Sequence, residues 1–141
     1  MPVDVETEIA IARPRDAVAG YATDPDRATE WYANIESVAW EPPLGVGSKL
    51  AFVARFLGRR LEYTYEVIEL TPERFVMRTA HGPFPMETTY TFRQEGPDTR
   101  MTLRNRGEPA GFAKVAAPMM ARAMRKANRA DLARLKEILE R

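Results

Sequence analysis

The chain has 141 residues, of which 45% are hydrophobic and 29% are charged, and its formal net charge is +1. These values exclude a wholly disordered chain and predict one domain, residues 1–141, that is large enough to bury a sizeable core. With no cysteine and one histidine, the sequence excludes disulfides, thiolate nucleophiles and thiolate-bound zinc, and we expect no metal and no cofactor.

The sequence also bears on location. No stretch approaches the roughly 20 apolar residues that cross a bilayer. The acidic start "MPVDVETE" has neither the basic nor the apolar part of a signal peptide. We therefore expect a cytoplasmic protein that does not insert into a membrane.

The N-terminal part predicts one strand followed by two short helices. Residues 3–12 alternate in hydrophobicity, which is typical of a strand with one buried face. After Pro14 the segment "TDPDRATEW" follows, in which Thr23 or Asp24 can cap a short helix that starts at Pro25.

The middle of the chain predicts a meander of strands. "SVAWE" reads as a strand and "PPLGVGS" as its loop, and residues 49–105 form strands broken at "LGRR", "TPER", "HGPFP" and "EGPD". Because these breaks are short, we expect antiparallel neighbours. In "LGRRLEYTYEVIEL", Tyr63 and Tyr65 alternate with polar residues, so we expect both tyrosines to face inward.

The last segment predicts one long helix. Its apolar stripe runs at steps of three and four residues through Ala113, Ala117, Met120, Met124, Asn128, Leu132, Leu135 and Leu139. Pro118 predicts a kink or a new helix start near Ala117. Residues 111–141 hold eight bases and three acids. A solvated helix face explains these bases better than a phosphate-binding patch, since no aromatic residues are interleaved with them, and we expect no nucleic-acid partner.

This order of elements resembles a known family. The first strand, the helices ending in "TDPDRATEWY", the segment "VAWEPPLGVGSKL", the meander and the closing "ADLARLKEILE" are similar to the START-like SRPBCC superfamily, in particular to its polyketide cyclase/dehydrase branch. The resemblance implies an α+β helix-grip fold. In that fold a curved antiparallel sheet of about seven strands wraps around a long C-terminal helix, two short helices follow the first strand, and a hydrophobic cavity lies between sheet and helix.

The alternation and the resemblance together predict a ligand cavity. The residues expected to line it are Phe52, Tyr63, Tyr65, Met77, Met86, Tyr90, Asn105, Phe112, Met120, Met124 and Asn128. Methionines adapt to irregular contents, and buried phenolic hydroxyls need partners. The alternative is a fully packed core, in which large sheet residues interlock with small helix residues.

A second group of residues is expected at the mouth of this cavity. In the topology that the resemblance implies, the "LGRR", "TAHGPFP" and "GEPAGF" turns lie near one end of the cavity, which places Arg59, Arg60, His81 and Phe84 at its mouth. The alternative is that these residues are ordinary solvated residues of surface turns and take no part in a cavity.

Two functions follow from these features. The first is binding of a hydrophobic small molecule, lipid-like or polyketide-like. The second is a polyketide cyclase, aromatase or dehydratase that acts on a reactive poly-β-keto substrate. In this function a tyrosine, His81 or an arginine would assist enolisation or loss of water, and the sequence does not say which. A non-catalytic interaction module is a third alternative. The sequence makes no prediction of the oligomeric state.

Overall fold

The computed structural model describes residues 3–108 and 117–141. Its elements follow the predicted order of a strand, short helices, six strands and a long helix. The strands are β1 (Val3–Ile11), β2 (Ile35–Ala39), β3 (Lys49–Phe56), β4 (Arg59–Leu70), β5 (Arg74–His81), β6 (Met86–Glu95) and β7 (Asp98–Gly107). The helices are α1 (Arg15–Ala22), the short 3₁₀ helix η1 (Pro25–Arg27), α2 (Ala28–Trp31) and α3 (Ala117–Leu139).

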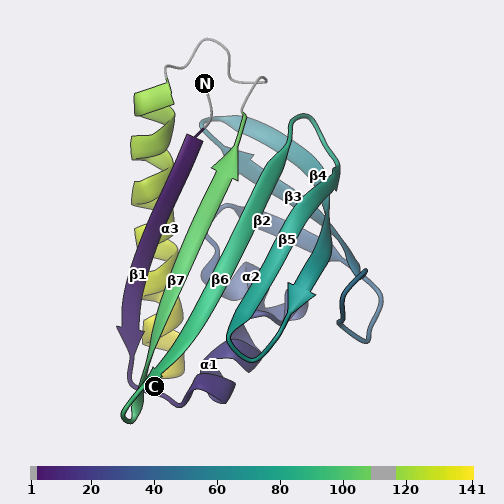
Figure 1. Ribbon diagram of the computed structural model, residues 1–141. Coiled ribbons are helices and arrows are strands. Elements are labelled where there is room, and N and C mark those ends of the chain that lie inside the picture. Colours follow the sequence, from purple (N-terminus) through teal and green to yellow (C-terminus); the bar gives the residue numbers. More distant parts are fainter. Residues whose placement is uncertain (1–2, 109–116) are drawn as a thin grey trace.

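The strands form a single antiparallel sheet in the order β1-β7-β6-β5-β4-β3-β2. Consecutive strands are neighbours except that β1, the first strand, pairs with β7, the last. Figure 1 shows the sheet curling so that β2 and β3 come round behind β6 and β7, while α3 lies along the inner side. The predicted helix-grip fold is confirmed.

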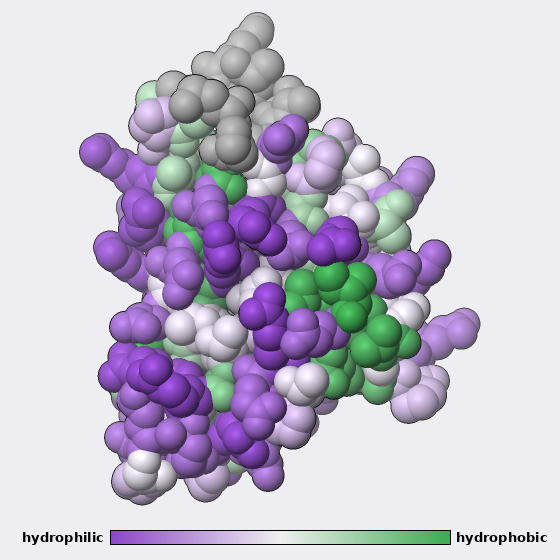
Figure 2. Space-filling view, viewed as in Figure 1, coloured by the Kyte–Doolittle hydropathy of each residue, from purple (hydrophilic) through white to green (hydrophobic). Residues whose placement is uncertain are grey.

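Alternating side chains explain why these segments are strands. In β1, Val3, Val5 and Thr7 are buried, whereas the acidic residues between them are exposed. The outer face is charged, and there Arg104 of β7 pairs with Asp4 of β1 at 2.6 Å. Figure 2 shows hydrophilic side chains over most of this face, with one hydrophobic patch toward β4 and β5.

The predicted orientation of β4 is confirmed. Tyr65 is buried and Tyr63 half-buried, whereas Glu62 is exposed. The turn before this strand has positive φ at Leu57 and Gly58, which suits a two-residue hairpin loop. The expected strand "SVAWE" is shifted, because the structure has β2 at Ile35–Ala39, before Trp40.

The helices begin where the sequence indicates. Asp24 caps η1, since its side chain accepts a hydrogen bond from the Asp26 backbone nitrogen. The described part of α3 starts at Ala117, and Pro118 is its second residue. Ala113 of the predicted stripe lies outside the described residues.

Two clusters of buried side chains hold the fold together. The larger cluster joins α1, α2 and the C-terminal half of α3 to the sheet, and it contains Trp31, Phe75, Phe92, Leu132 and Leu135. The smaller cluster contains Val3, Val5, Phe84 and Met120. The space between these clusters is not fully packed, and it forms the candidate site.

Candidate functional site

A partly open cavity of about 140 Å³ lies between the concave face of the sheet and α3. It extends from Tyr32 and Asp131 to Phe56, Phe84 and Met120, near the turns that join β3 to β4 and β5 to β6. Its wall includes residues of both core clusters. In the part of the chain that the structure describes, this is the main candidate for a ligand site.

One side of the cavity is aromatic. The ring of Phe52 stacks on Tyr63 with centroids 5.4 Å apart and meets Tyr65 edge-on at 5.7 Å. Tyr63 and Tyr65 lie 5.1 Å apart in a T-shaped arrangement. These three residues, the aromatic trio, come from adjacent strands, because the register of β3 and β4 sets Phe52 opposite Tyr63. The trio gives a flat, apolar surface against which another ring can pack.

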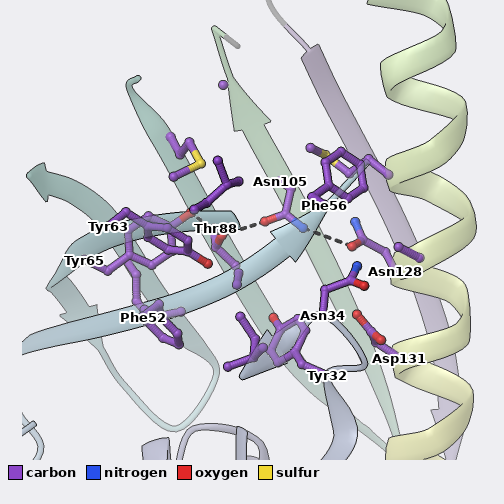
Figure 3. A pocket seen from close by; sticks show the side chains of 18 of the residues that line it. Tyr32, Asn34, Phe52, Phe56, Tyr63, Tyr65, Thr88, Asn105, Asn128 and Asp131 are labelled. Carbon is purple, nitrogen blue, oxygen red and sulfur yellow. Dashed lines mark hydrogen bonds between the residues drawn. The ribbon is translucent and has the colours of Figure 1, made fainter. Parts of the chain in front are cut away.

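A chain of hydrogen bonds crosses the cavity from the trio to α3 (Figure 3). Thr88 donates to Asn105 Oδ1 at 2.5 Å, and Asn105 Nδ2 donates to Asn128 Oδ1 at 3.2 Å. Because the single Thr88 proton is used in this way, Tyr65 must donate its proton to Thr88 Oγ1, 2.9 Å away. The chain ends at Asn128 Nδ2, which is buried and has no partner among the described residues.

A second polar group lies one helical turn further along α3. Asp131 is only 3% exposed, and its Oδ1 accepts a hydrogen bond from the Ala33 backbone nitrogen at 3.1 Å. Burial raises the pKa of Asp131 to about 6. The hydroxyls of Tyr32 and Tyr90 lie nearby and bond each other at 2.5 Å. This carboxyl therefore changes charge close to neutral pH.

The buried tyrosines stay protonated. Burial raises the pKa of Tyr65 to about 12 and raises the pKa values of Tyr32, Tyr63 and Tyr90 well above the ordinary value. Their hydroxyls are hydrogen-bonding groups at neutral pH and do not act as phenolate bases.

The structure brings together most of the residues predicted to line a cavity. On its wall lie Phe52, Tyr63, Tyr65, Met77, Met86, Tyr90, Asn105, Met120, Met124 and Asn128, while Phe112 lies outside the described residues. Their binding of a ligand stays a prediction.

The four residues expected at the mouth lie in two different settings. Phe84 lines the cavity, but Arg59, Arg60 and His81 do not, and all three are exposed. Arg60 makes ion pairs on the exposed surface with Glu36 and Glu62. In the register of β3 and β4, Arg59 lies opposite Phe56 and Arg60 lies opposite Arg55, and both of these partners line the cavity. His81 ends β5 at an exposed position. A place at the mouth of the cavity stays a prediction for all three residues.

Sequence reasoning missed Tyr32, Asn34 and Asp131, which all line the cavity. Asp131 follows Asn128 by three residues, so the periodicity of the helix predicts that the two lie side by side on the inner face. Its residue type gave no signal of a place inside, because a carboxylate is rarely buried. Within residues 3–108 and 117–141, no three His, Asp or Glu side chains cluster as metal ligands do, and no helix is long and apolar enough to cross a membrane.

One family model matches almost the whole chain. The model of the family "Polyketide cyclase / dehydrase and lipid transport" matches residues 2–140. The match covers nearly the whole chain, so this protein belongs to that family, as its resemblance to the SRPBCC superfamily predicted. A comparison with curated proteins finds no significant match.

Solved structures share the fold. Protein TTHA0849 from Thermus thermophilus is 24% identical, with a TM-score of 0.83 over 96% of this chain and 96% of that chain. The Zhui aromatase/cyclase from Streptomyces sp. R1128 is 17% identical, with a TM-score of 0.81 over 100% and 95%. A START superfamily protein from Mycobacterium smegmatis is 16% identical, with a TM-score of 0.82 over 97% of each chain. Identities this low show the fold alone.

Proposed function

We propose that this protein binds a hydrophobic small molecule, lipid-like or polyketide-like, in the cavity between the sheet and α3. The observation that supports the proposal most directly is the cavity itself, about 140 Å³ in volume and lined mainly by apolar and aromatic side chains. Protein interiors are otherwise close-packed, and an apolar cavity of about 150 Å³ can hold a benzene-sized molecule. The family description, which includes lipid transport, agrees with this function.

Burial of apolar surface supplies the binding energy. At about 25 cal/mol per Å², a ligand that buries roughly 200 Å² of apolar surface gains about 5 kcal/mol before the cost of immobilising it. The aromatic trio and the methionines of α3 provide that surface, since Phe52, Met120 and Met124 all lie on the cavity wall.

Filling the cavity tests the proposal. Ala127 lies on α3 and lines the cavity, so the ring added by Ala127→Phe occupies space that the ligand needs. We expect the parent protein to bind the neutral hydrophobic dye N-phenyl-1-naphthylamine, with a rise in dye fluorescence and in melting temperature. Ala127→Phe should weaken dye binding about tenfold or more, a loss of about 1.4 kcal/mol, without lowering the melting temperature.

Ala133→Phe is the matched control, because Ala133 is an exposed residue of the same helix. It should leave dye binding unchanged. The opposite result is a parent protein that binds no dye and an Ala127→Phe variant destabilised by about 1–3 kcal/mol, as in an overpacked core. That result would show a packed interior and contradict the proposal.

A second candidate function is catalysis on a poly-β-keto substrate, as a cyclase, aromatase or dehydratase. Asp131 favours it, because a carboxyl group with a pKa of about 6 on the cavity wall can take up or release a proton near neutral pH. In this role the Asp131 carboxylate removes a proton from a carbon next to a carbonyl, and the cavity holds the substrate folded.

A single variant tests this second candidate. Asp131→Asn keeps the shape of the side chain and removes its titration, so turnover of a poly-β-keto thioester should fall by about 10²–10⁴-fold while binding of the dye persists. Product formation at the parent rate would exclude Asp131 as the base. If the parent protein cyclises the substrate no faster than protein-free solution does, catalysis is excluded and binding is the only one of the two functions that remains.

A further inference from the structure

Asn128 carries an unsatisfied donor at the cavity. Its side chain is 4% exposed, and its Oδ1 accepts from Asn105, so the amide orientation is fixed by the hydrogen-bond chain. Its Nδ2 has two protons and no partner in the described ranges. Most buried polar groups in folded proteins are paired, because an unpaired one costs about 1–3 kcal/mol. The position therefore suits an acceptor atom that is not part of the described chain.

Asp131 offers an acceptor beside this donor. Residues three apart on a helix are neighbours on one face, about 5–6 Å apart at their Cβ atoms. The hydrogen bond from Ala33 uses one oxygen of Asp131, and a carboxylate has about four acceptor positions. Figure 3 shows Asn128, Asn34 and Asp131 one below another beside α3, at the side of the cavity opposite the aromatic trio.

The charges around the cavity disfavour an anionic ligand. Two arginines line the wall, but Arg55 pairs with Glu36 and Arg106 pairs with Glu87, each at 2.5 Å. Arg60 also pairs with Glu36 and Arg78 also pairs with Glu87, so both wall arginines belong to ion-pair networks on the exposed side. The group that remains beside Asn128 is the Asp131 carboxylate, which repels a carboxylate or sulfonate placed near it.

We propose that the cavity selects ligands with a flat apolar ring that carries one uncharged hydroxyl group, as in a phenol. The hydroxyl oxygen accepts a hydrogen bond from Asn128 Nδ2 and donates its proton to Asp131, while the ring packs on Phe52, Tyr63 and Tyr65. A hydroxyl satisfies both groups at once, whereas a ketone oxygen satisfies Asn128 alone. This inference rests on the proposed binding function and specifies the class of ligand.

Three matched compounds test the inference: 4-propylphenol, propylbenzene and 4-propylbenzoate, titrated by calorimetry near neutral pH. All three contain the same propyl-substituted ring. 4-Propylphenol adds a hydroxyl to this ring, 4-propylbenzoate adds a carboxylate, and propylbenzene adds neither. We expect 4-propylphenol to bind about tenfold more tightly than propylbenzene, because two hydrogen bonds in a desolvated site are worth at least about 1.4 kcal/mol. The benzoate should bind most weakly.

Two variants check which residues are responsible. Asn128→Leu removes the donor with little change of volume, so the preference of the protein for 4-propylphenol over propylbenzene should be lost. Asp131→Asn removes the negative charge, so 4-propylbenzoate should bind more tightly than it does to the parent protein. A merely structural role of these residues would shift all three compounds together.

The outcomes separate the two levels of the proposal. Equal affinities for 4-propylphenol and propylbenzene, or tightest binding of the benzoate, would overturn the hydroxyl inference and leave the binding function standing. Failure of propylbenzene and of the fluorescent dye to bind would overturn the binding function itself. Because the comparison of the three compounds uses the parent protein, it holds even where a variant does not fold.

Discussion

Replacing Asp131 with asparagine should stabilise the protein at neutral pH by about 3 kcal/mol in the free energy of unfolding. Burial raises the pKa of this carboxyl from 3.8 to about 6. Each pKa unit corresponds to about 1.36 kcal/mol. The rise from 3.8 to about 6 therefore means that ionisation of the buried carboxyl lowers the free energy of unfolding by about 3 kcal/mol. Asparagine keeps an oxygen that accepts the hydrogen bond from Ala33 and carries no charge to bury.

The gain should depend on pH in one direction. Between the unfolded pKa of 3.8 and the folded pKa of about 6, the folded protein holds more protons than the unfolded chain, so the stability of the parent protein falls as pH rises. The advantage of Asp131→Asn should therefore be complete above pH 6 and absent below pH 3.8. Urea denaturation of both proteins across this range measures it.

Asp16→Asn is the control for this experiment. The Asp16 side chain is 89% exposed in the first turn of α1, so its replacement should change stability by no more than about 1 kcal/mol, as a helix-dipole effect. A gain for Asp131→Asn that is the same at every pH would contradict the raised pKa, since only titration of the buried carboxyl makes the gain vary.

Trp31→Ala should be among the most destabilising single substitutions, at about 3–5 kcal/mol of unfolding free energy. The Trp31 side chain is 1% exposed, stacks on Tyr32 with centroids 4.0 Å apart and meets Tyr90 edge-on at 5.8 Å. Its removal opens a void beneath the two tyrosines that line the cavity. Thermal and urea unfolding measure the loss, and ligand binding should weaken in parallel.

Two further variants make the test of Trp31 specific. Trp31→Phe should cost less than Trp31→Ala, because it keeps an aromatic ring and removes an indole N–H that is buried without a partner among the described residues. Trp40→Ala should also cost less, since Trp40 is half-buried and its indole N–H donates to Asp26 at 2.8 Å. Equal losses for Trp31→Ala and Trp40→Ala would contradict the assignment of Trp31 to the core.

Local periodicity determined which residues face inward. The alternation around Tyr63 and Tyr65 predicts the buried face of β4, because successive side chains of a strand point to opposite sides. The spacing of Met120, Asn128, Leu132 and Leu135 predicts the inner face of α3 in the same way. These features depend on neighbours in the sequence, so they were accessible without the structure.

Tertiary structure alone decided which distant residues meet. Tyr32 reaches Tyr90 across 58 positions in the sequence, and Ala33 reaches Asp131 across 98. The end of a strand lines the cavity only where strand register and sheet curvature turn its side chains inward, so the place of Arg59, Arg60 and His81 at the mouth stays a prediction. The sequence by itself thus determined most of the apolar wall through its periodicity, and the helix-grip fold through its resemblance to a family. Only the assembled structure decided that a carboxyl group and an unpaired amide lie together inside, because the burial of a polar group depends on every element that packs around it.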